Sequence, residues 1–231
     1  MEETRTVKTD HNTTPPHQDA AAGAAIYTQF VLSIYDPLVI DFENPFVWKC
    51  PSPLLLEHYN RHVSGNHLDV GVGTGYFLDH CRFPSDDPAI ALMDLNPNCL
   101  RYTSARLRRY RTTTYLADVL EPINFDLPTF DSIGLNYLLH CLPGNLSYKG
   151  RVFSNLKPFL NSGGVLFGTT FLGQGVEFNR LGGLFFRVYN AVRVLNNRND
   201  NLADLEEALE RNFAKYSVHT LGCAAFFAGE V

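Results

Sequence analysis

The sequence predicts an α/β fold in which a mostly parallel sheet is covered by helices on both faces. Short apolar stretches alternate with stretches of helical periodicity over most of the chain, and this alternation is typical of strands joined through helices. Such connections are right-handed and make neighbouring strands parallel. A turn with three alternate glycines, Gly71, Gly73 and Gly75, joins the first apolar strand to the helix that follows it.

The composition indicates one sizeable domain, which we expect over residues 20–231. The chain has 231 residues, of which 45% are hydrophobic, enough to bury a full core. Its formal net charge of −5 argues against a nucleic-acid partner. The cysteines are odd in number, scattered and without a C-x-x-C pair. The polar amino terminus is not expected to be a signal peptide, and no apolar run approaches the roughly 20 residues of a membrane span. We therefore expect a cytoplasmic protein without a membrane partner.

The amino-terminal part divides into a polar stretch and an amphipathic one. Residues 1–19 are rich in Thr, His, Pro and Asn and have no apolar periodicity, so we expect a disordered tail. Residues 20–64 are predicted to be largely helical. Apolar residues from Tyr27 to Tyr35 recur at helical spacing, and Pro37 is expected to end that helix near Tyr35.

Residues typical of helix ends, and the spacing of apolar residues, predict the helices and strands that follow. A helix begins with Ser52 as its N-cap and Pro53 in its first turn and ends at Gly65, with His58 and His62 exposed. Beyond it we expect, in order, a strand from 67, a helix over 76–82, a strand over 89–94, a helix over 97–110 after the N-cap Asn96, strands over 112–117 and 130–137, a helix over 145–160 that ends in a turn at 161–164, and a strand over 165–171.

The last part of the sequence predicts a helical insertion and a final pair of strands. The insertion covers residues 171–215. Within it, apolar residues from Phe178 to Leu195 recur at helical spacing, and a capped helix runs from Asn201 to about Phe213. Residues 216–221 and 224–228 are predicted to form an antiparallel pair around Gly222 and Cys223.

Polar residues at the ends of predicted strands indicate a ligand site. The carboxyl ends of parallel strands meet at one edge of the sheet, where ligands bind, and the residues at these ends are Asp69, Asp94, Asp118 and Asn136. The glycines allow a sharp turn and a close approach of the backbone to a ligand. Because Tyr76 takes the place of the third glycine of dinucleotide-binding loops, the spacing argues against a dehydrogenase. Asp69 is expected to meet a cationic group of the ligand.

Residues 68–75, Leu-Asp-Val-Gly-Val-Gly-Thr-Gly, resemble motif I of the class I S-adenosylmethionine-dependent methyltransferases. Asp94 matches that family's acidic residue for the ribose hydroxyls, and Asp118 matches the carboxylate that accepts from the adenine amino group. Residues 130–140 match the fourth strand and its substrate-facing loop, so the resemblance covers about residues 67–170. It implies a Rossmann-like sheet of seven strands, mostly parallel with an antiparallel final strand, and S-adenosylmethionine as the cofactor.

The resemblance also implies a set of binding residues. Those expected around S-adenosylmethionine are Asp69, Gly71, Gly73, Gly75, Asp94, Leu95, Asp118, Val119 and Asn136, with Tyr27 and Tyr35 from the amino-terminal segment. Small methyltransferases often carry such a segment as a lid, and we interpret residues 20–64 as one. An aromatic face above the sulfonium would attract this cation by about 0.5–2 kcal/mol and exclude water.

The implied activity is methyl transfer to the oxygen or nitrogen of a small, largely apolar acceptor, by in-line displacement without a metal. It resembles that of methyltransferases of microbial secondary metabolism. The insertion 171–215 is expected near the acceptor pocket. His140, in the loop after the fourth strand, is the candidate catalytic base because an imidazole can accept a proton near neutral pH.

Two other functions are compatible with parts of the sequence. A methyltransferase-like protein can bind the cofactor without transferring a methyl group and act as a cyclase, a pericyclase or a regulatory subunit. The product distinguishes this function, because it would be isomerised and not methylated. An RNA or protein methyltransferase would be expected to have a basic groove or an Asn-Pro-Pro-Tyr-like loop, whereas Asn136-Tyr137-Leu138-Leu139 has no proline. The sequence does not predict an oligomeric state.

Overall fold

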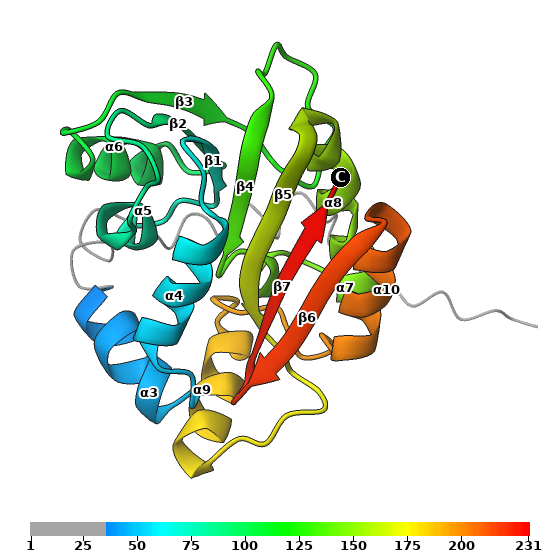
Figure 1. Cartoon of the computed structure of the whole chain (residues 1–231). Helices are drawn as coiled ribbons and strands as arrows, with labels where there is room; N and C mark the ends of the chain where they lie inside the picture. Colours follow the sequence, from blue (N-terminus) through cyan, green and yellow to red (C-terminus); the bar gives the residue numbers. More distant parts are fainter. Residues whose placement is uncertain (1–35) are drawn as a thin grey trace, which may run out of the picture.

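The sheet has seven strands in the order β3-β2-β1-β4-β5-β7-β6 (Figure 1). A computed structural model describes residues 36–231, and its strands are Asn66–Val70 (β1), Ala89–Asp94 (β2), Thr112–Leu116 (β3), Phe130–Asn136 (β4), Leu160–Phe171 (β5), Lys215–Leu221 (β6) and Ala224–Glu230 (β7). Neighbours from β3 to β5 pair in parallel, and β7 runs antiparallel to both β5 and β6. The predicted sheet is confirmed. The predictions for the tail 1–19, for Tyr27 and for Tyr35 lie outside the described residues.

Helices cover both faces of the sheet, as predicted. The first face carries α4 (Ser52–His62), α5 (Tyr76–His80) and α6 (Pro97–Arg106), and the second carries α7 (Leu146–Lys149), α8 (Arg151–Leu156) and α10 (Leu202–Asn212). Each face has its own apolar core. Because side chains alternate along a strand, Phe226 of β7 packs in the first core and its neighbour Phe227 packs in the second.

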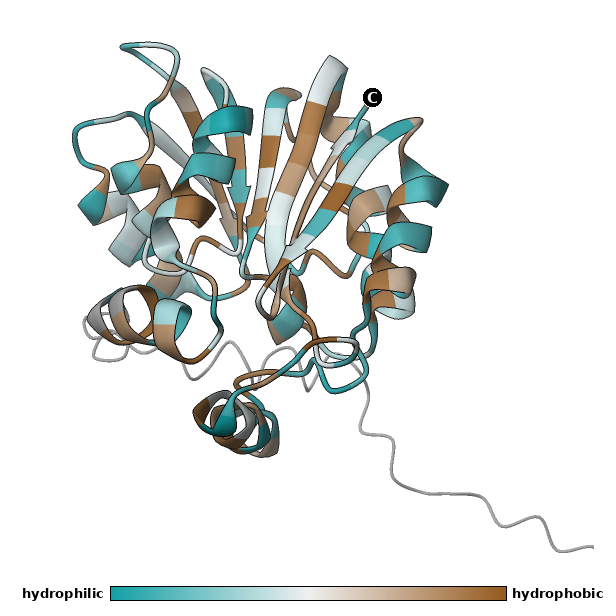
Figure 2. Cartoon of the chain, turned by 60° about the horizontal axis from the view of Figure 1, so that its bottom comes forward, coloured by the Kyte–Doolittle hydropathy of each residue, from teal (hydrophilic) through white to brown (hydrophobic). Residues whose placement is uncertain are grey.

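Two helical segments lie beyond the carboxyl ends of the strands (Figures 1 and 2). The amino-terminal one consists of the π-helical η1 (Asp36–Glu43) and α3 (Asn44–Phe46), and the other is α9 (Arg180–Ala191). The two are joined by polar contacts. The Asn179 side chain donates to the Phe46 carbonyl at 2.9 Å, and the Tyr189 hydroxyl donates to Glu43 Oε1 at 2.5 Å. Of the predicted insertion 171–215, α9 therefore lies at the sheet edge, while α10 packs against α7 and α8.

The helix predicted over 145–160 is broken into shorter pieces. Gly150 separates α7 from α8, and a Cβ at this position would lie 2.7 Å from Ala208 Cβ of α10. The short 3-10 helix η3 (Lys157–Phe159) follows. Strand β5 then begins at Leu160, so that the predicted turn at 161–164 belongs to the strand, next to an irregular register in β4.

For α4, the predicted exposure of both histidines and the predicted N-cap are wrong, and His62 is half-buried. His58 is 5% exposed, because the carboxyl-terminal strands cover it, and its Nε2 lies 3.2 Å from the Phe227 carbonyl oxygen. Ser52 is the first residue of the helix and not its N-cap. Its hydroxyl donates to the Ile40 carbonyl and accepts from the Asn44 side chain, so Ser52 fixes the segment η1 and α3 to α4.

Candidate active site

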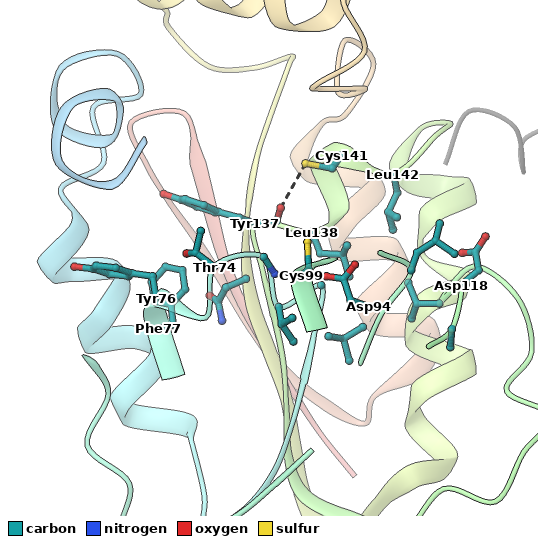
Figure 3. A pocket seen from close by; sticks show the side chains of 18 of the residues that line it. Thr74, Tyr76, Phe77, Asp94, Cys99, Asp118, Tyr137, Leu138, Cys141 and Leu142 are labelled. Carbon is teal, nitrogen blue, oxygen red and sulfur yellow. Dashed lines mark hydrogen bonds between the residues drawn. The ribbon is translucent and has the colours of Figure 1, made fainter. Parts of the chain in front are cut away.

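A pocket opens at the carboxyl ends of β1, β2 and β4 (Figure 3). The space that its lining residues border is about 980 Å³, of which a part is open to solvent. The strand order reverses between β1 and β4, and ligands of open α/β sheets bind at such a switch point. The predicted residues that line the pocket are Gly71, Gly73, Asp94, Leu95, Asp118, Val119 and Asn136.

The glycine loop between β1 and α5 presents bare backbone to the pocket. Gly71, Gly73 and Gly75 have φ angles of 72°, 51° and 72°, a region that residues with a Cβ rarely adopt. A Cβ at Gly71 would lie 2.7 Å from Leu138 Cδ1, whereas a Cβ at Gly73 would meet no atom within 4 Å. The space beside Gly73 is therefore available to a ligand.

Asp94 ends β2 and lies between the glycine-loop residues and Asp118 along the pocket (Figure 3). Its Oδ1 accepts the Asn96 N–H at 2.8 Å, and its Oδ2 lies 3.5 Å from the Gly73 nitrogen. Burial raises the pKa of Asp94 to about 6, against the opposing effect of the backbone N–H groups around it. No Lys or Arg pairs with it among the described residues, so this carboxyl is oriented but suited to neutral donors such as hydroxyls.

Asp118 and Asn136 complete the polar lining. Asp118 Oδ1 accepts the Leu120 N–H at 3.0 Å. Asn136 is 7% exposed, and its Oδ1 accepts the Thr169 hydroxyl at 3.1 Å, while its Nδ2 has no hydrogen-bond partner within residues 36–231. A buried donor without a partner costs about 1–3 kcal/mol. A ligand acceptor at this position would remove that cost.

Two predicted residues lie beside the pocket without lining it. Asp69 is 6% exposed, and burial raises its pKa well above the usual range. It packs against Gly134, where a Cβ would come within 3.0 Å of Asp69 Oδ1. Burial therefore disfavours the charged form of Asp69 in the structure without a ligand. Gly75 lies against α6, since a Cβ there would be 2.6 Å from Thr103 Cγ2.

His140 does not line the pocket either, and its geometry does not support the predicted role as a base. The side chain is 3% exposed, and its Nδ1 accepts the Phe171 N–H at 3.1 Å. A neutral imidazole with Nδ1 as acceptor carries its proton on Nε2, so it has no free lone pair for a substrate proton. Burial, and then the nearby Lys149, lower the pKa of His140 to about 3. The ring stacks on Phe171 at 4.8 Å between centroids.

A buried ion pair holds the loop that contains His140. Lys149 Nζ and Asp200 Oδ2 are 2.6 Å apart, and both side chains are 0% exposed. Lys149 also donates to the Asn196 carbonyl at 2.9 Å, and the Asn196 N–H donates to the His140 carbonyl at 2.7 Å. Removing one member of such a pair leaves a buried charge alone, at a cost of about 3–5 kcal/mol. The connection from α9 to α10 is thereby fixed behind the pocket.

Several lining residues were not predicted from the sequence. Tyr137 has a positive φ of 60° directly after β4, and its hydroxyl donates to Asn44 Oδ1 at 2.9 Å. It joins the pocket to the segment η1 and α3, which also supplies Ile40. The others that were missed include Thr74, Tyr76, Phe77, Cys99, Leu138, Cys141 and Leu142. Leu138, Cys141 and Leu142 follow Asn136 within a few residues, so the predicted end of β4 could have indicated them. No feature of the neighbouring sequence indicates that Ile40 lines the pocket.

Neither a metal cluster nor a membrane-spanning helix occurs in the described part of the chain. Within residues 36–231, no three His, Cys, Asp or Glu side chains come together in a way that could hold a metal ion. No helix in this range has the length and apolar character needed to cross a membrane.

Comparisons with known proteins identify the family. A family profile described as a methyltransferase domain matches residues 68–166. The demethylluteothin O-methyltransferase of Streptomyces thioluteus is 38% identical over 210 residues, which are 91% of this chain and 91% of that protein. The chain belongs to the methyltransferase family. This methyltransferase uses S-adenosylmethionine as its cofactor. The methyltransferase ctvB of Aspergillus terreus is 41% identical over 217 residues, 90% of this chain and 94% of that protein.

Solved structures share the fold of this methyltransferase at low sequence identity. The DhpI complex with S-adenosylhomocysteine has a TM-score of 0.65 at 14% identity and covers 93% of this chain and 97% of that one. The N-methyltransferase NodS of Bradyrhizobium japonicum, in complex with S-adenosylhomocysteine, has a TM-score of 0.60 at 16% identity and covers 90% and 98%. These structures confirm the class I methyltransferase fold expected from the sequence.

Proposed function

We propose that this methyltransferase methylates a hydroxyl oxygen of a small, largely apolar acceptor. The observation that carries the proposal is the lining of the pocket, in which apolar side chains such as Phe77, Leu138 and Leu142 share the same space as the oriented carboxyl of Asp94. Relatives named as O-methyltransferases support the choice of oxygen: the Streptomyces protein and the O-methyltransferase of a physcion biosynthesis cluster in Aspergillus chevalieri, each 38% identical to this chain.

The residues present fit S-adenosylmethionine. We assign the ribose hydroxyls to Asp94, whose carboxyl has no cationic partner of its own in the described structure, and the adenine to the end of the pocket at Asp118 and Val119. The bare backbone at Gly73 and the unpaired Asn136 Nδ2 would face the methionine part, where a carboxylate can accept hydrogen bonds. Asp69 and Gly75 would support the loop from behind.

The chain contributes mainly by positioning. When bound, S-adenosylmethionine supplies a methyl group on a positively charged sulfur, which a nucleophile displaces in line without help from a metal. The walls of the pocket would hold the acceptor oxygen about 3 Å from the methyl carbon, and such positioning can supply about 7–11 kcal/mol. Displacement would form an oxygen–carbon bond in place of the carbon–sulfur bond, and the hydroxyl proton would pass to solvent through the open side of the pocket. Ile40, Tyr137 and Leu138 would exclude water from this end of the pocket.

An acceptor screen tests the proposal. The purified protein is incubated with S-adenosylmethionine and a panel of small apolar phenols, enols and amines. Mass spectrometry then identifies the methylated atom and measures the S-adenosylhomocysteine formed. We expect O-methylated products that are absent with Asp94→Ala. Methylation confined to nitrogen would overturn the choice of acceptor atom. An isomerised product formed without S-adenosylhomocysteine would overturn methyl transfer itself.

A further inference from the structure

A charged cluster joins the back of the glycine loop to the start of η1. Its members are Asp36, Thr74, Asp79, Arg106 and Arg109. Arg106 Nη1 lies 2.5 Å from Asp36 Oδ2, and Arg106 Nε lies 2.8 Å from Asp79 Oδ2. The Thr74 hydroxyl donates to Asp36 Oδ1 at 2.7 Å, and Arg106 also donates to the Thr74 carbonyl at 3.3 Å. One guanidinium therefore binds both the loop and the first residue of η1.

We propose that Arg106 is a positioning residue that couples the glycine loop to residues 36–48, so that a ligand bound at the loop also orders that segment. This inference rests on the proposed cofactor site. Arg106 itself does not line the pocket. It binds the lining residue Thr74 directly, and its other partner, Asp36, begins the helix η1 that carries the lining residue Ile40.

On the loop side of this link, α6 binds the glycine loop at two points. Arg106 ends α6, and one helical turn earlier the Thr103 hydroxyl donates to the Gly73 carbonyl at 3.0 Å. Arg106 adds the bond to the next carbonyl, that of Thr74. A ligand that fixes the backbone of the loop from the pocket side therefore also fixes the Thr74 hydroxyl and carbonyl that bind Asp36 and Arg106.

The segment side of the link reaches the opposite wall of the pocket. From Asp36, η1 continues through Ile40, whose side chain lines the pocket. Asn44, at the start of α3, then accepts the hydroxyl of Tyr137, another lining residue. A displacement of Asp36 would therefore be transmitted along one continuous helical segment to two residues of that wall.

Arg106 is the member of the cluster on which the ion pair of Asp36 depends. Asp79 is shared with Arg109, which contacts both its carboxylate and its backbone carbonyl. Within the described residues, Asp36 is paired with Arg106 alone. The side chains of Arg106 and Asp36 are 19% and 24% exposed, so solvent and salt screen this pair less than a surface pair. Arg109, with a side chain 44% exposed, touches neither Asp36 nor Thr74 and is a matched control.

Amide hydrogen exchange with S-adenosylhomocysteine as the probe tests the coupling. In the wild type and in Arg109→Met, we expect the ligand to slow exchange in peptides from residues 36–48 by at least about fivefold, as is typical of coupled sites. Arg106→Met should lose most of this effect, and its calorimetric Kd for S-adenosylhomocysteine should rise at least about fivefold, because the coupling is reciprocal.

A second variant and two other outcomes keep the inference falsifiable. Asp36→Asn can still accept the Thr74 hydroxyl but loses the ion pair, so it should weaken the coupling as Arg106→Met does, while its thermal midpoint stays close to that of the wild type. Protection of 36–48 that persists in Arg106→Met, or that is lost equally in Arg109→Met, would overturn the inference while leaving the cofactor site intact. Failure of the wild type to bind the ligand would instead overturn the proposed site and the coupling together.

Discussion

Buried polar residues in the middle of the sheet and at its carboxyl edge differ in how fully other parts of the protein satisfy their hydrogen bonds. In the middle, His67 is 0% exposed and both of its ring nitrogens are paired, Nε2 with the Tyr59 hydroxyl at 2.9 Å and Nδ1 with the Ser132 hydroxyl at 2.8 Å. Ser132 in turn accepts the Ser64 N–H at 2.9 Å. At the edge, Asn136 Nδ2 has no partner in the described structure, and burial disfavours the charged form of Asp94.

This difference separates polar residues that stabilise the fold from those kept for a ligand. A buried polar group is costly unless it is hydrogen-bonded. In the middle of the sheet other side chains provide the bonds. At the edge the remaining bonding capacity faces a pocket that the cofactor can fill. His140 lies at the edge but resembles the polar residues that stabilise the fold, because the Phe171 N–H already occupies its Nδ1.

Removing an edge carboxyl should have the largest effect on binding and little effect on folding. We expect Asp94→Ala to lose about two charge-assisted hydrogen bonds, each about 1.5–3 kcal/mol. The affinity for S-adenosylmethionine should therefore fall by about a hundredfold or more, which calorimetric titration measures. Asp126→Ala removes an exposed carboxylate and should leave the affinity unchanged. Equal affinities of Asp94→Ala and the wild type would refute the assignment of the ribose site.

A fall in pH should lower the free energy of unfolding through the buried histidines and raise it through Asp94 at the carboxyl edge. Burial lowers the pKa of His58 to about 4 and that of His67 to about 3. The unfolded chain binds these protons first, so stability falls as the pH drops below about 6.5. The loss reaches about 3 kcal/mol for His58 near pH 4, at 1.36 kcal/mol per pKa unit. Asp94, whose pKa is raised to about 6, has the opposite sign: its protonated form favours folding, and this contribution is lost as the pH rises through 6.

Urea unfolding at a series of pH values measures the histidine effect. His58→Gln keeps an N–H that can donate to the Phe227 carbonyl but has no titrating ring. We expect its free energy of unfolding to depend less on pH between 6.5 and 4 than that of the wild type. The same pH dependence in both proteins would show that His58 does not carry the effect.

Ligand affinity should fall in acid because of the raised pKa of Asp94. The carboxyl must be ionised to accept hydrogen bonds from two hydroxyls. Below its pKa of about 6, binding therefore requires loss of a proton, and the affinity for S-adenosylhomocysteine should decrease by up to about tenfold per pH unit. Titration calorimetry at pH 7, 6 and 5 measures this slope. Asp94→Asn should bind weakly at all three values without the slope, and a persistent slope would point to another group.

Replacing His140 should have the smallest effect. In His140→Asn the amide oxygen can take the place of Nδ1 and accept the Phe171 N–H, so we expect kcat to change less than about tenfold, below the about 10²–10⁴-fold contribution of a general base. The pH–rate profile should keep its shape. His140→Phe loses the acceptor and should be less stable than His140→Asn. A loss of activity beyond a hundredfold in His140→Asn would restore the catalytic role.

The predicted features that the structure confirms were each marked by neighbouring residues. Asp94 and Asn136 could be placed at strand ends because each directly follows an apolar run, and the parallel topology then brought them together. The N-cap at Asn96 was identified in the same way, and its side chain accepts the Asn98 N–H. Such signals lie within a few residues of the feature they predict, so no knowledge of distant contacts was needed.

What could not be predicted depends on contacts between distant parts of the chain. The burial of His58 arises from β7, whose Phe226 ring lies 5.4 Å from the His58 ring and whose Phe227 carbonyl, 169 positions later in the chain than His58, lies 3.2 Å from Nε2. Ile40 reaches the pocket because η1 is fixed by Ser52 and Asn44, and Tyr137 binds Asn44 from 93 positions away. For Asp69 and His140, residue type and position suggested a chemical role, whereas their burial and the hydrogen bond from the Phe171 N–H to His140 arise from distant contacts that the sequence does not display.

The place of β7 between β5 and β6 has a consequence for synthesis of the chain. On the ribosome, β1 to β4 emerge well before β7, so the loops of the cofactor site can take shape while one edge of the sheet is still open. β6 has no partner strand until β7 inserts beside it, and His58 meets its backbone acceptor only then. Closing contacts of such large sequence separation slows folding. A nascent chain stalled before residue 224 should therefore expose the edge of β5 and be a target for chaperones.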